Sequence, residues 1–440
     1  MESKTFTIFT YGCQMNKYDS ERMAGNLLHQ GYLPSQAAEK ADLILINTCS
    51  VRAKAEQKVY SQLGRLKELK EKNPNLIIAV AGCVAQQEGK RIFKKAPHVN
   101  LVLGPGSIGQ LPELLQKAGD SADKVLALEQ AATFQEEQPW RESKIQAWLS
   151  IMEGCNNFCS YCIVPYTRGR ERSKASAEIT KEINDLGGRG YREVTLLGQN
   201  VNSYGRDLEE SIDFSDLLTN IHQIEEIKRL RFLTSHPRDL SWKLINTMAM
   251  LPKICKHLHL PLQSGSDSIL RAMNRGYTSS EYEENVLALR KLVPDVGLTT
   301  DIIVGFPGES HQDYLATKRL MESIQFDNIF LFNYSPRPET KAASYPDQVP
   351  NEIKNKRFEE ILNLQKEITL KRNKALEGTI QEILVEGESK NNCEMLTGHT
   401  TNGKIVNFPG SSDLIGELVK VQVIKGGLYS LTGKPFIAGH

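Results

Sequence analysis

The sequence predicts an α/β protein in three parts: an N-terminal parallel α/β sheet, a central partial (β/α)6 barrel and a small C-terminal antiparallel β-barrel of the OB-like kind. Three observations predict this order. Strand-like runs alternate with helical segments up to about residue 120. Six further strand-like runs each end in glycine, proline or polar residues. The segment after about residue 375 holds short strand-like runs separated by glycine and asparagine turns.

Composition sets limits on the class of protein. The chain has 440 residues, enough for two to four domains. Its net charge is +1, so a nucleic-acid partner would have to bind a local basic patch. The N-terminus "MESKTFTIFTYG" lacks the apolar core of a signal peptide, and no apolar run is long enough to span a bilayer. We therefore expect a cytoplasmic protein with no membrane partner, in which clustered cysteines bind metal or react rather than form disulfides.

The N-terminal domain, residues 4–120, is predicted from three strand–helix units. Its helices are expected to begin near Asp19–Ser20, to run from about Ala53 to Lys72, and to extend through Phe93. Strands that alternate with helices in this way form a parallel sheet covered on its faces. The three strands have the sequences "TFTIFTYG", "DLILIN" and "NLIIAVAG".

A polar linker over residues 120–144 leads to a central domain, residues 141–371. Each of its strands ends in a polar or glycine-rich cluster, and in a (β/α) barrel this edge carries the active site. Six units rather than eight predict a partial barrel that is open along one side. The six strands have the sequences "AWLSIMEG", "EVTLLGQN", "RLRFLTSHP", "HLHLPLQSG", "LTTDIIVGFPGE" and "NIFLFNYSPRP".

The end of the chain changes character. A helix from about Asn351 to Ala375 is expected to link the barrel to residues 374–438. That last segment contains "VKVQV", which alternates apolar and polar residues as a half-buried strand does. Small OB-like barrels often bind oligonucleotides, so we predict an RNA-binding role for this domain.

Three cysteines, Cys155, Cys159 and Cys162, lie within eight residues directly after the first barrel strand. A closed zinc site would need a fourth nearby Cys or His, and the sequence offers none. A redox pair of Cys159 and Cys162 would leave Cys155 unexplained. An iron–sulfur cluster held by three thiolates accounts for all three cysteines and leaves one metal position open for chemistry.

Three lone cysteines, Cys13, Cys49 and Cys83, each follow one of the first three predicted strands. Their separations of 36 and 34 residues match one strand–helix unit each. Parallel strands present their carboxyl ends at one edge of a sheet, so these thiols should converge and form a second cluster site. Cys255 and Cys393 occupy no equivalent position, and we expect them only to pack or to be exposed.

At this point the whole chain resembles the methylthiotransferase family of radical S-adenosylmethionine (SAM) enzymes. The resemblance rests on "YGCQMNKYDSE", "NTCSVRAKAEQKVYSQLG", "AGCVAQQEG" and "CNNFCSYCIVPYTRGRERS". It covers a three-cysteine N-terminal domain, a radical SAM core and a C-terminal TRAM domain. Within the family, these stretches are most similar to the branch that acts on an isopentenylated adenosine of tRNA.

The resemblance implies two 4Fe-4S clusters, with SAM bound to the open iron of the cluster in the central domain. It further implies insertion of sulfur and a methyl group at C2 of N6-isopentenyladenosine next to the anticodon, with two SAM consumed per turnover. Expected partners are the tRNA anticodon stem–loop, an electron donor and iron–sulfur or sulfur supply proteins. Alternative interpretations are another methylthiotransferase substrate, such as a ribosomal protein or threonylcarbamoyl-adenosine, and a non-catalytic iron–sulfur protein that binds RNA or transfers electrons.

A SAM site needs partners for an ammonium, a carboxylate, a ribose and an adenine. The strand ends of the barrel offer polar side chains, and Arg275 is the best match for the carboxylate by charge. Tyr161 matches the family position that lies against the adenine. The predicted SAM-binding residues are Tyr161, Gln199, Ser235, Gln263, Arg275 and Asp301.

A basic run beside the central cysteines predicts an RNA contact. The stretch "RGRERSK", residues 168–174, carries four cations against one carboxylate. Such a patch fits the phosphate backbone of a nucleic acid. We therefore expect Arg168, Arg170 and Arg172 to contact RNA.

Overall fold

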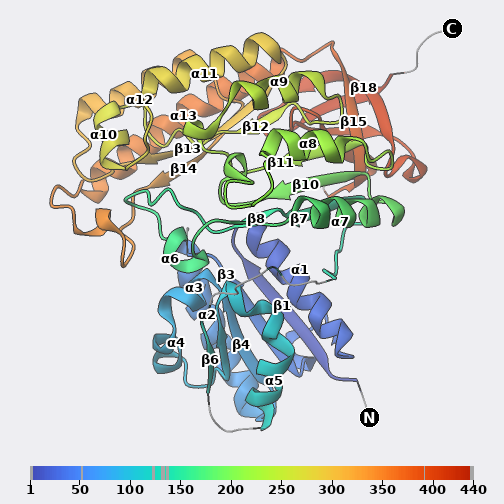
Figure 1. The fold of residues 1–440 in the computed structure, drawn as a ribbon, viewed down its shortest axis with the longest axis vertical. Helices are drawn as coiled ribbons and strands as arrows, with labels where there is room; N and C mark the ends of the chain where they lie inside the picture. Colours follow the sequence, from blue (N-terminus) through green and yellow to red (C-terminus); the bar gives the residue numbers. More distant parts are fainter. Residues whose placement is uncertain are drawn as a thin grey trace.

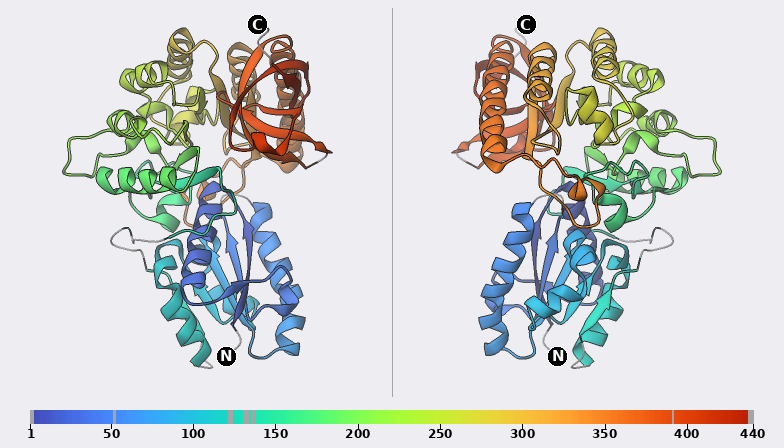
Figure 2. Two further views of the ribbon diagram at one scale, coloured as in Figure 1. Left: turned by 90° about the vertical axis from the view of Figure 1, so that its right-hand side faces the viewer. Right: turned by 90° about the vertical axis from the view of Figure 1, so that its left-hand side faces the viewer.

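The structure is a computed structural model that describes residues 3–50, 53–120, 124–129, 134, 138–390 and 392–436, without the side chains of residues 53–56 and 393. Figure 1 shows the N-terminal sheet domain, in blue, below the central domain, in green to orange. The C-terminal strands, in red, form a separate small barrel beside the central domain (Figure 2). No helix in the part of the chain described here has the length and apolar character to cross a membrane.

The N-terminal domain is a six-stranded, entirely parallel sheet in the order β2-β1-β3-β4-β5-β6. Its apolar strands are buried on both faces between helices, as in other parallel sheets. The strands are β1 (Thr5–Tyr11), β2 (Leu33–Pro34), β3 (Leu43–Thr48), β4 (Ile77–Gly82), β5 (Leu101–Leu103) and β6 (Val125–Ala127). The helices are α1 (Gln14–His29), α2 (Ala53–Lys72), α3 (Cys83–Glu88), α4 (Lys90–Lys95) and α5 (Leu111–Asp120).

The three predicted strands and the second helix are confirmed, but two helix boundaries are wrong. Helix α1 begins at Gln14, with Cys13 as its N-cap, rather than near Asp19–Ser20. The predicted third helix is split into α3 and α4 at Gly89, where φ is +50°. Strands β2, β5 and β6 were not predicted, because runs of two or three residues carry no readable periodicity.

The central domain contains the six predicted strands in chain order. They form two three-stranded parallel sheets, β7-β10-β11 and β12-β13-β14. Between the two sheets, Leu230 of β11 forms a parallel bridge with Ile254, which precedes β12, and the Ser235 N–H after β11 donates to the His259 carbonyl of β12 at 3.4 Å. The strands are β7 (Gln146–Ser150), β10 (Glu193–Leu197), β11 (Arg229–Phe232), β12 (His257–His259), β13 (Gly297–Val304) and β14 (Asn328–Asn333).

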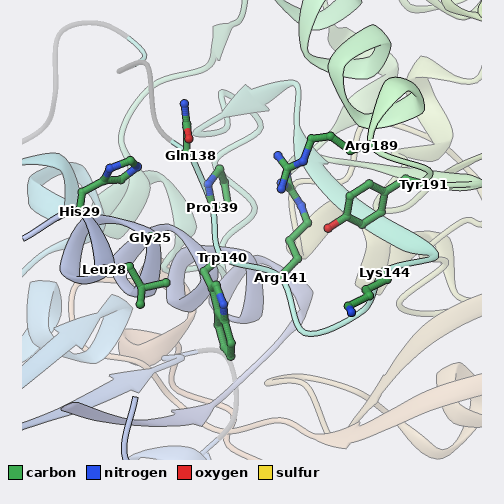
Figure 3. Close-up of a pocket in the computed structure, with 10 residues that line it drawn as sticks. All are labelled: Gly25, Leu28, His29, Gln138, Pro139, Trp140, Arg141, Lys144, Arg189 and Tyr191. Carbon is green, nitrogen blue, oxygen red and sulfur yellow. The ribbon is translucent and has the colours of Figure 1, made fainter. Parts of the chain in front are cut away.

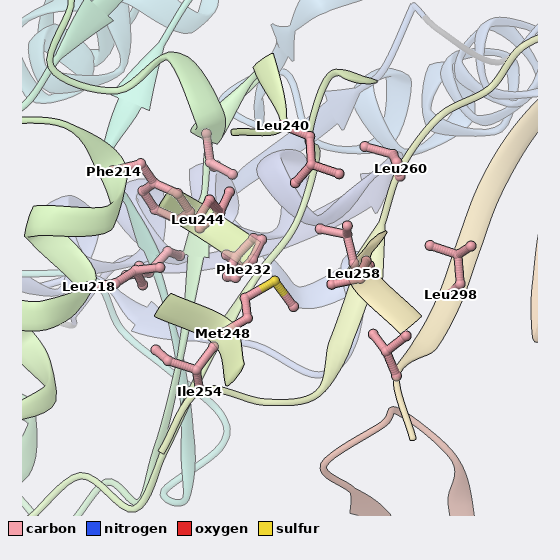
Figure 4. Packing of buried hydrophobic residues seen from close by; sticks show 14 of the residues in the cluster. Phe214, Leu218, Phe232, Leu240, Leu244, Met248, Ile254, Leu258, Leu260 and Leu298 are labelled. Carbon is pink, nitrogen blue, oxygen red and sulfur yellow. The ribbon is translucent and has the colours of Figure 1, made fainter. Parts of the chain in front are cut away.

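Helices cover the outside of this wall and bury a continuous apolar core. Figure 4 shows Phe214 and Leu218 of one helix and Met248 of the next against Phe232 and Leu258 of the strands. The helices are α7 (Ser176–Gly188), α8 (Phe214–His222), α9 (Trp242–Met250), α10 (Asp267–Ala272), α11 (Ser279–Leu292) and α12 (His311–Ile324).

The first barrel strand is interrupted before the cysteines. After β7, residues Met152–Glu153 form β8, which pairs antiparallel with β9 (Arg172–Ser173). This short hairpin encloses residues 154–171, which include the three central cysteines and helix α6 (Val164–Arg168). The cysteine loop is therefore closed at both ends by backbone pairing, a feature that the sequence did not predict.

The C-terminal domain is a closed five-stranded barrel, as predicted, in the order β15-β16-β17-β19-β18. Helix α13 (Asn351–Lys374) leads into it. Arg229 of β11 is 2% exposed and donates to the backbone oxygens of His399 and Glu382 at 2.6 and 3.0 Å, which ties the barrel to the central domain. The strands are β15 (Ile380–Ser389), β16 (Asn392–Thr400), β17 (Ile405–Pro409), β18 (Leu418–Gly426) and β19 (Leu431–Pro435).

Candidate active site

The three lone cysteines of the N-terminal domain lie at one edge of its sheet. Cys13, Cys49 and Cys83 follow β1, β3 and β4, which are neighbours in the sheet. The register pairs Tyr11 with Thr48 and Thr48 with Gly82, so the three chains leave the sheet at the same level. Parallel pairing thus brings together residues that are far apart in the sequence.

The thiols at this edge act on one another. A hydrogen bond with Cys49 and the nearby charge of Arg168 together lower the pKa of Cys13 to about 6, although burial acts in the opposite direction. Burial raises the pKa of Cys83. The charge of Arg168 and a hydrogen bond from Arg168 partly oppose this rise. The lowered pKa makes the Cys13 thiol easier to deprotonate, and the thiolate is the form that binds iron.

Asparagine side chains hold the turn that carries Cys13. The backbone N–H and the thiol of Cys13 both donate to Oδ1 of Asn16, at 3.3 and 3.4 Å. The Asn16 amide donates to Oδ1 of Asn47 at 3.2 Å, and Asn47 donates back to the Asn16 carbonyl at 2.7 Å. Both asparagines are fully buried, so this network fixes the thiol edge. In the sequence, the Cys-x-x-Asn spacing of Cys13 and Asn16 resembles a capping box and is the pattern that points to Asn16.

Gly82 is required by this network. Its φ is +91°, and a Cβ there would lie 2.5 Å from both Oδ1 of Asn47 and the carbonyl of Thr48. We expect Gly82→Ala to lower the free energy of unfolding by about 3 kcal/mol or more, since left-handed strain and a backbone clash add. Gly31→Ala is the matched control, because Gly31 has φ +80° with open space around it. Urea unfolding measures the free energy of unfolding of both variants. An equal loss in both would contradict the predicted clash of a Cβ at Gly82.

The central cysteines form a second group in the loop between β8 and β9. Burial, together with the charge of Cys159, raises the pKa of Cys155 to about 11 and that of Cys162 to about 12. The N–H of Cys155 donates to the Gly169 carbonyl at 3.1 Å, and that of Cys162 donates to the Cys159 carbonyl at 2.9 Å. Thiols with a raised pKa bind as thiolates only beside a compensating positive charge, which a metal cluster supplies.

Among the residues that the structure describes, no three His, Cys, Asp or Glu side chains converge on one metal position. The thiolates of an iron–sulfur cluster each bind a different iron, so a cluster site surrounds a larger volume than a single-ion site.

Arg275 lies directly against the central thiols. Its guanidinium donates to the Cys159 sulfur at 3.4 Å, to the Pro261 carbonyl at 2.9 Å and to the Tyr277 hydroxyl at 3.1 Å. The side chain is buried, and the charges of Tyr161 and Cys159 are among the causes that raise its pKa. The permanent positive charge of Arg275 therefore lies beside the central thiols, where it can bind an anionic group.

Several strand-end polar groups are buried without a hydrogen bond. Nε2 of Gln199, Oγ of Ser235 and Oε1 of Gln263 have no partner among the described residues. The other amide atom of Gln199, Oε1, accepts from the Gly154 N–H at 2.5 Å, which links this side chain to the cysteine loop. Unpaired buried polar atoms are costly, so such a set indicates a polar ligand that completes them.

Backbone strain is concentrated at the same place. Phe158, Thr234, Gln263 and Asn274 all have φ between +46° and +71°, although none is glycine. Each lies next to a cysteine, a strand end or Arg275. Strain of this kind persists only where the surrounding structure enforces it, and it is typical of ligand sites.

The chain matches three protein-family descriptions that cover these regions. Residues 5–104 match the uncharacterized protein family UPF0004, residues 149–321 match the radical SAM superfamily, and residues 374–436 match the TRAM domain. The first two matches contain the two cysteine groups.

Full-length relatives decide the family. The chain is 49% identical over 437 residues to the tRNA-2-methylthio-N(6)-dimethylallyladenosine synthase of Carboxydothermus hydrogenoformans, with 98% of this chain and 99% of the relative covered. It is 50% identical over 429 residues to the protein of the same name from Syntrophobacter fumaroxidans, with 97% and 94% covered. The chain belongs to the radical SAM methylthiotransferase family.

A solved structure supports the fold of this methylthiotransferase. The radical SAM methyltransferase TsrM from Kitasatospora setae, determined with cobalamin and a 4Fe-4S cluster bound, superimposes with a TM-score of 0.56 over 78% of this chain and 74% of TsrM. The sequences are only 14% identical, so the similarity concerns the fold alone.

Family membership implies a 4Fe-4S cluster and SAM, and the central site fits them. The buried Arg275 contacts the Cys159 sulfur, Gln199 contacts the cysteine loop at Gly154, and polar atoms of Gln199, Ser235 and Gln263 are left unpaired. The charges of Arg275 and of the neighbouring thiols act on the Tyr161 hydroxyl. The remaining predicted residue, Asp301, has its carboxylate 3.5 Å from Nε2 of His259, and its backbone carbonyl accepts from the Gln263 N–H at 2.8 Å.

The three arginines predicted to contact RNA differ in their surroundings. Arg168 is buried and pairs with Asp19 of α1 at 2.5 Å, so its expected RNA contact is replaced by a contact inside the protein. Arg172 pairs with Glu153 at 3.1 Å. Arg170 is exposed, with its guanidinium 4.5 Å from the centre of the Phe158 ring.

A cavity of about 580 Å³ lies elsewhere, between the C-terminal half of α1, the linker and the end of α7. Figure 3 shows Arg141, Arg189 and Tyr191 on one side and His29 on the other. None of the predicted site residues lines it, whereas Cys13 is at the opposite end of α1. Cys255 is buried beside Glu193, in line with its expected packing role, and the Cys393 side chain lies outside the described residues.

Proposed function

We propose that this chain inserts sulfur and a methyl group at C2 of N6-isopentenyladenosine next to the anticodon of tRNA, with two SAM used per turnover. Two 4Fe-4S clusters would serve the reaction. Cys155, Cys159 and Cys162 would hold the cluster that binds SAM. Cys13, Cys49 and Cys83 would hold an auxiliary cluster that donates sulfur. An electron donor and iron–sulfur or sulfur supply proteins would be the further partners.

One observation carries the proposal: two three-thiol groups from separate domains meet at one interface. Helix α6, which follows Cys162, packs on α3, which begins at Cys83 (Figure 1). Sulfur transfer needs the donor and the radical source close together, and the packing of α6 on α3 supports such an arrangement.

The residues of the site have separate tasks in this scheme. Bound SAM on a reduced cluster supplies one-electron chemistry able to break an aromatic C–H bond, which acid–base catalysis cannot do. Arg275 would orient the carboxylate of SAM, and Tyr161 would lie against its adenine. The unpaired polar atoms of Gln199, Ser235 and Gln263 would form hydrogen bonds with polar groups of SAM. The buried setting keeps water from reactive groups.

The function is tested with the full chain reconstituted anaerobically. It is incubated with SAM, a reductant and an anticodon stem–loop that carries N6-isopentenyladenosine. We expect a methylthio nucleoside and 5′-deoxyadenosine by mass spectrometry, and no methylthio product from the unmodified stem–loop. Release of 5′-deoxyadenosine without that nucleoside would favour another substrate. Absence of 5′-deoxyadenosine would favour a non-catalytic iron–sulfur protein.

An exposed aromatic and cationic group beside the central loop supports the RNA partner. The Phe158 ring meets the Tyr166 ring edge-on at 6.1 Å, Tyr166 is 41% exposed, and Arg170 lies over Phe158. Aromatic faces with a nearby guanidinium bind unpaired bases and phosphates. A base extruded from its stack is also what the enclosed thiol sites require.

We expect Arg170→Ala to weaken stem–loop binding several-fold and to reduce the slope of log affinity against log salt by about one, because one phosphate contact is lost. Fluorescence anisotropy at several salt concentrations measures both quantities. Arg91→Ala is the control: Arg91 is 66% exposed at its side chain and lies on α4, away from the interface. Equal behaviour of the two variants would contradict a contact at Arg170.

A further inference from the structure

Arg168 joins the two thiol groups through buried contacts. It is the last residue of α6 in the central domain, yet it pairs with Asp19 of the N-terminal helix α1 at 2.5 Å. The Asp19 side chain is 0% exposed and that of Arg168 is 5% exposed. Helix α6, which ends at Arg168, packs on α3, which begins at Cys83, and the charge of Arg168 lowers the pKa of both Cys83 and Cys13. One domain thus places a permanent positive charge inside the thiol site of the other.

The pair belongs to a chain of alternating charges that crosses the interface. Arg22 lies 3.5 Å from the second oxygen of Asp19 and 3.4 Å from Glu153. Glu153, on β8, directly precedes the central cysteine loop of residues 154–171, and Arg168 lies near the end of that loop. The loop is therefore attached at both ends to α1, whose N-cap is Cys13.

We propose that Arg168 is a positioning residue for the auxiliary cluster: the central domain supplies the guanidinium that completes the thiol site of the N-terminal domain, and Asp19 holds it there. The proposal rests on the proposed function, because it takes Cys13, Cys49 and Cys83 as cluster ligands. Burying this charge is favourable only if anions surround it. The Asp19 carboxylate is one, and a cluster with three thiolates is the other.

The expected effect has a definite sign. A reduced cluster carries one more negative charge than an oxidised cluster, so a nearby cation stabilises the reduced form and raises the reduction potential. Loss of the Arg168 charge should therefore make the auxiliary cluster harder to reduce. The central cluster, which has Arg275 as its own neighbouring cation, should keep its potential.

The test is an EPR-monitored redox titration of full-length reconstituted variants. We expect Arg168→Gln to shift the auxiliary potential to a more negative value, Arg168→Lys to shift it less, and the central cluster to stay unchanged. Arg22→Gln is the matched control, because it removes the other cation that pairs with Asp19.

The outcomes separate this inference from the proposed function. If Arg168→Gln titrates like Arg22→Gln, the inference is wrong while the two-cluster function stands. If Arg168→Gln fails to load the auxiliary cluster, retained loading in Arg22→Gln supports the inference, and equal loss in both overturns it. If the unmodified chain itself never holds an auxiliary cluster, both the inference and the two-cluster function fail.

Discussion

Cys83→Ala is expected to abolish methylthio product while 5′-deoxyadenosine release continues. Cys83 lies in the N-terminal thiol group, beside Arg168 and Cys13, and not among the central thiols. Its loss should remove the sulfur donor and leave the SAM-cleaving cluster in place. Mass spectrometry of nucleosides and of 5′-deoxyadenosine in one reaction measures both products.

The control for this prediction is Cys255→Ala. Cys255 is also buried, at 1% exposure, but it lies beside Glu193 rather than at either thiol group. We expect it to retain both products. Equal loss of methylthio product in both variants would mean that the effect comes from general destabilisation. Product from Cys83→Ala at the normal rate would contradict the role of the N-terminal thiols.

Arg275→Gln is expected to lower 5′-deoxyadenosine release by a factor of about one hundred or more, with the central cluster still present. The guanidinium is the buried cation nearest the Cys159 sulfur, at 3.4 Å, and a misplaced substrate group commonly costs this much in rate. The change in the EPR signal of the reduced cluster on addition of SAM should also disappear.

A matched arginine exists for comparison. Arg290 of α11 is partly buried and donates to the Gln325 carbonyl at 3.3 Å, and the charges that act on it are those of Arg372, Asp327 and Tyr282 rather than those of the thiols. Arg290→Gln should keep both the EPR change and 5′-deoxyadenosine release. An Arg275→Gln enzyme that still responds to SAM as the unmodified chain does would show that another residue holds the carboxylate.

Periodicity and motif spacing predicted most of the fold. The three N-terminal strands, the six barrel strands and the small C-terminal barrel were all readable, because each has an apolar run bounded by glycine or polar residues. The short strands β2, β5 and β6 exist only because their neighbours in the sheet offer hydrogen bonds. Tertiary pairing of this kind leaves no local pattern in the sequence.

Site residues could be placed from the sequence where the sheet topology alone fixes their positions. Cys13, Cys49 and Cys83 could be placed together because parallel strands end at one edge. Arg168 could not be placed, because its partner Asp19 lies 149 residues earlier in the chain and in another domain. A basic run is ordinarily a solvated face, and only the docked structure shows that one of its cations is buried.

Iron and sulfide analysis, together with Mössbauer spectroscopy of the anaerobically reconstituted chain, tests the central claim most directly. Two three-thiol sites predict about eight irons per chain in two 4Fe-4S clusters, and about four when Cys13, Cys49 and Cys83 are replaced together. About four irons in the unmodified chain, unchanged by that triple replacement, would contradict the account.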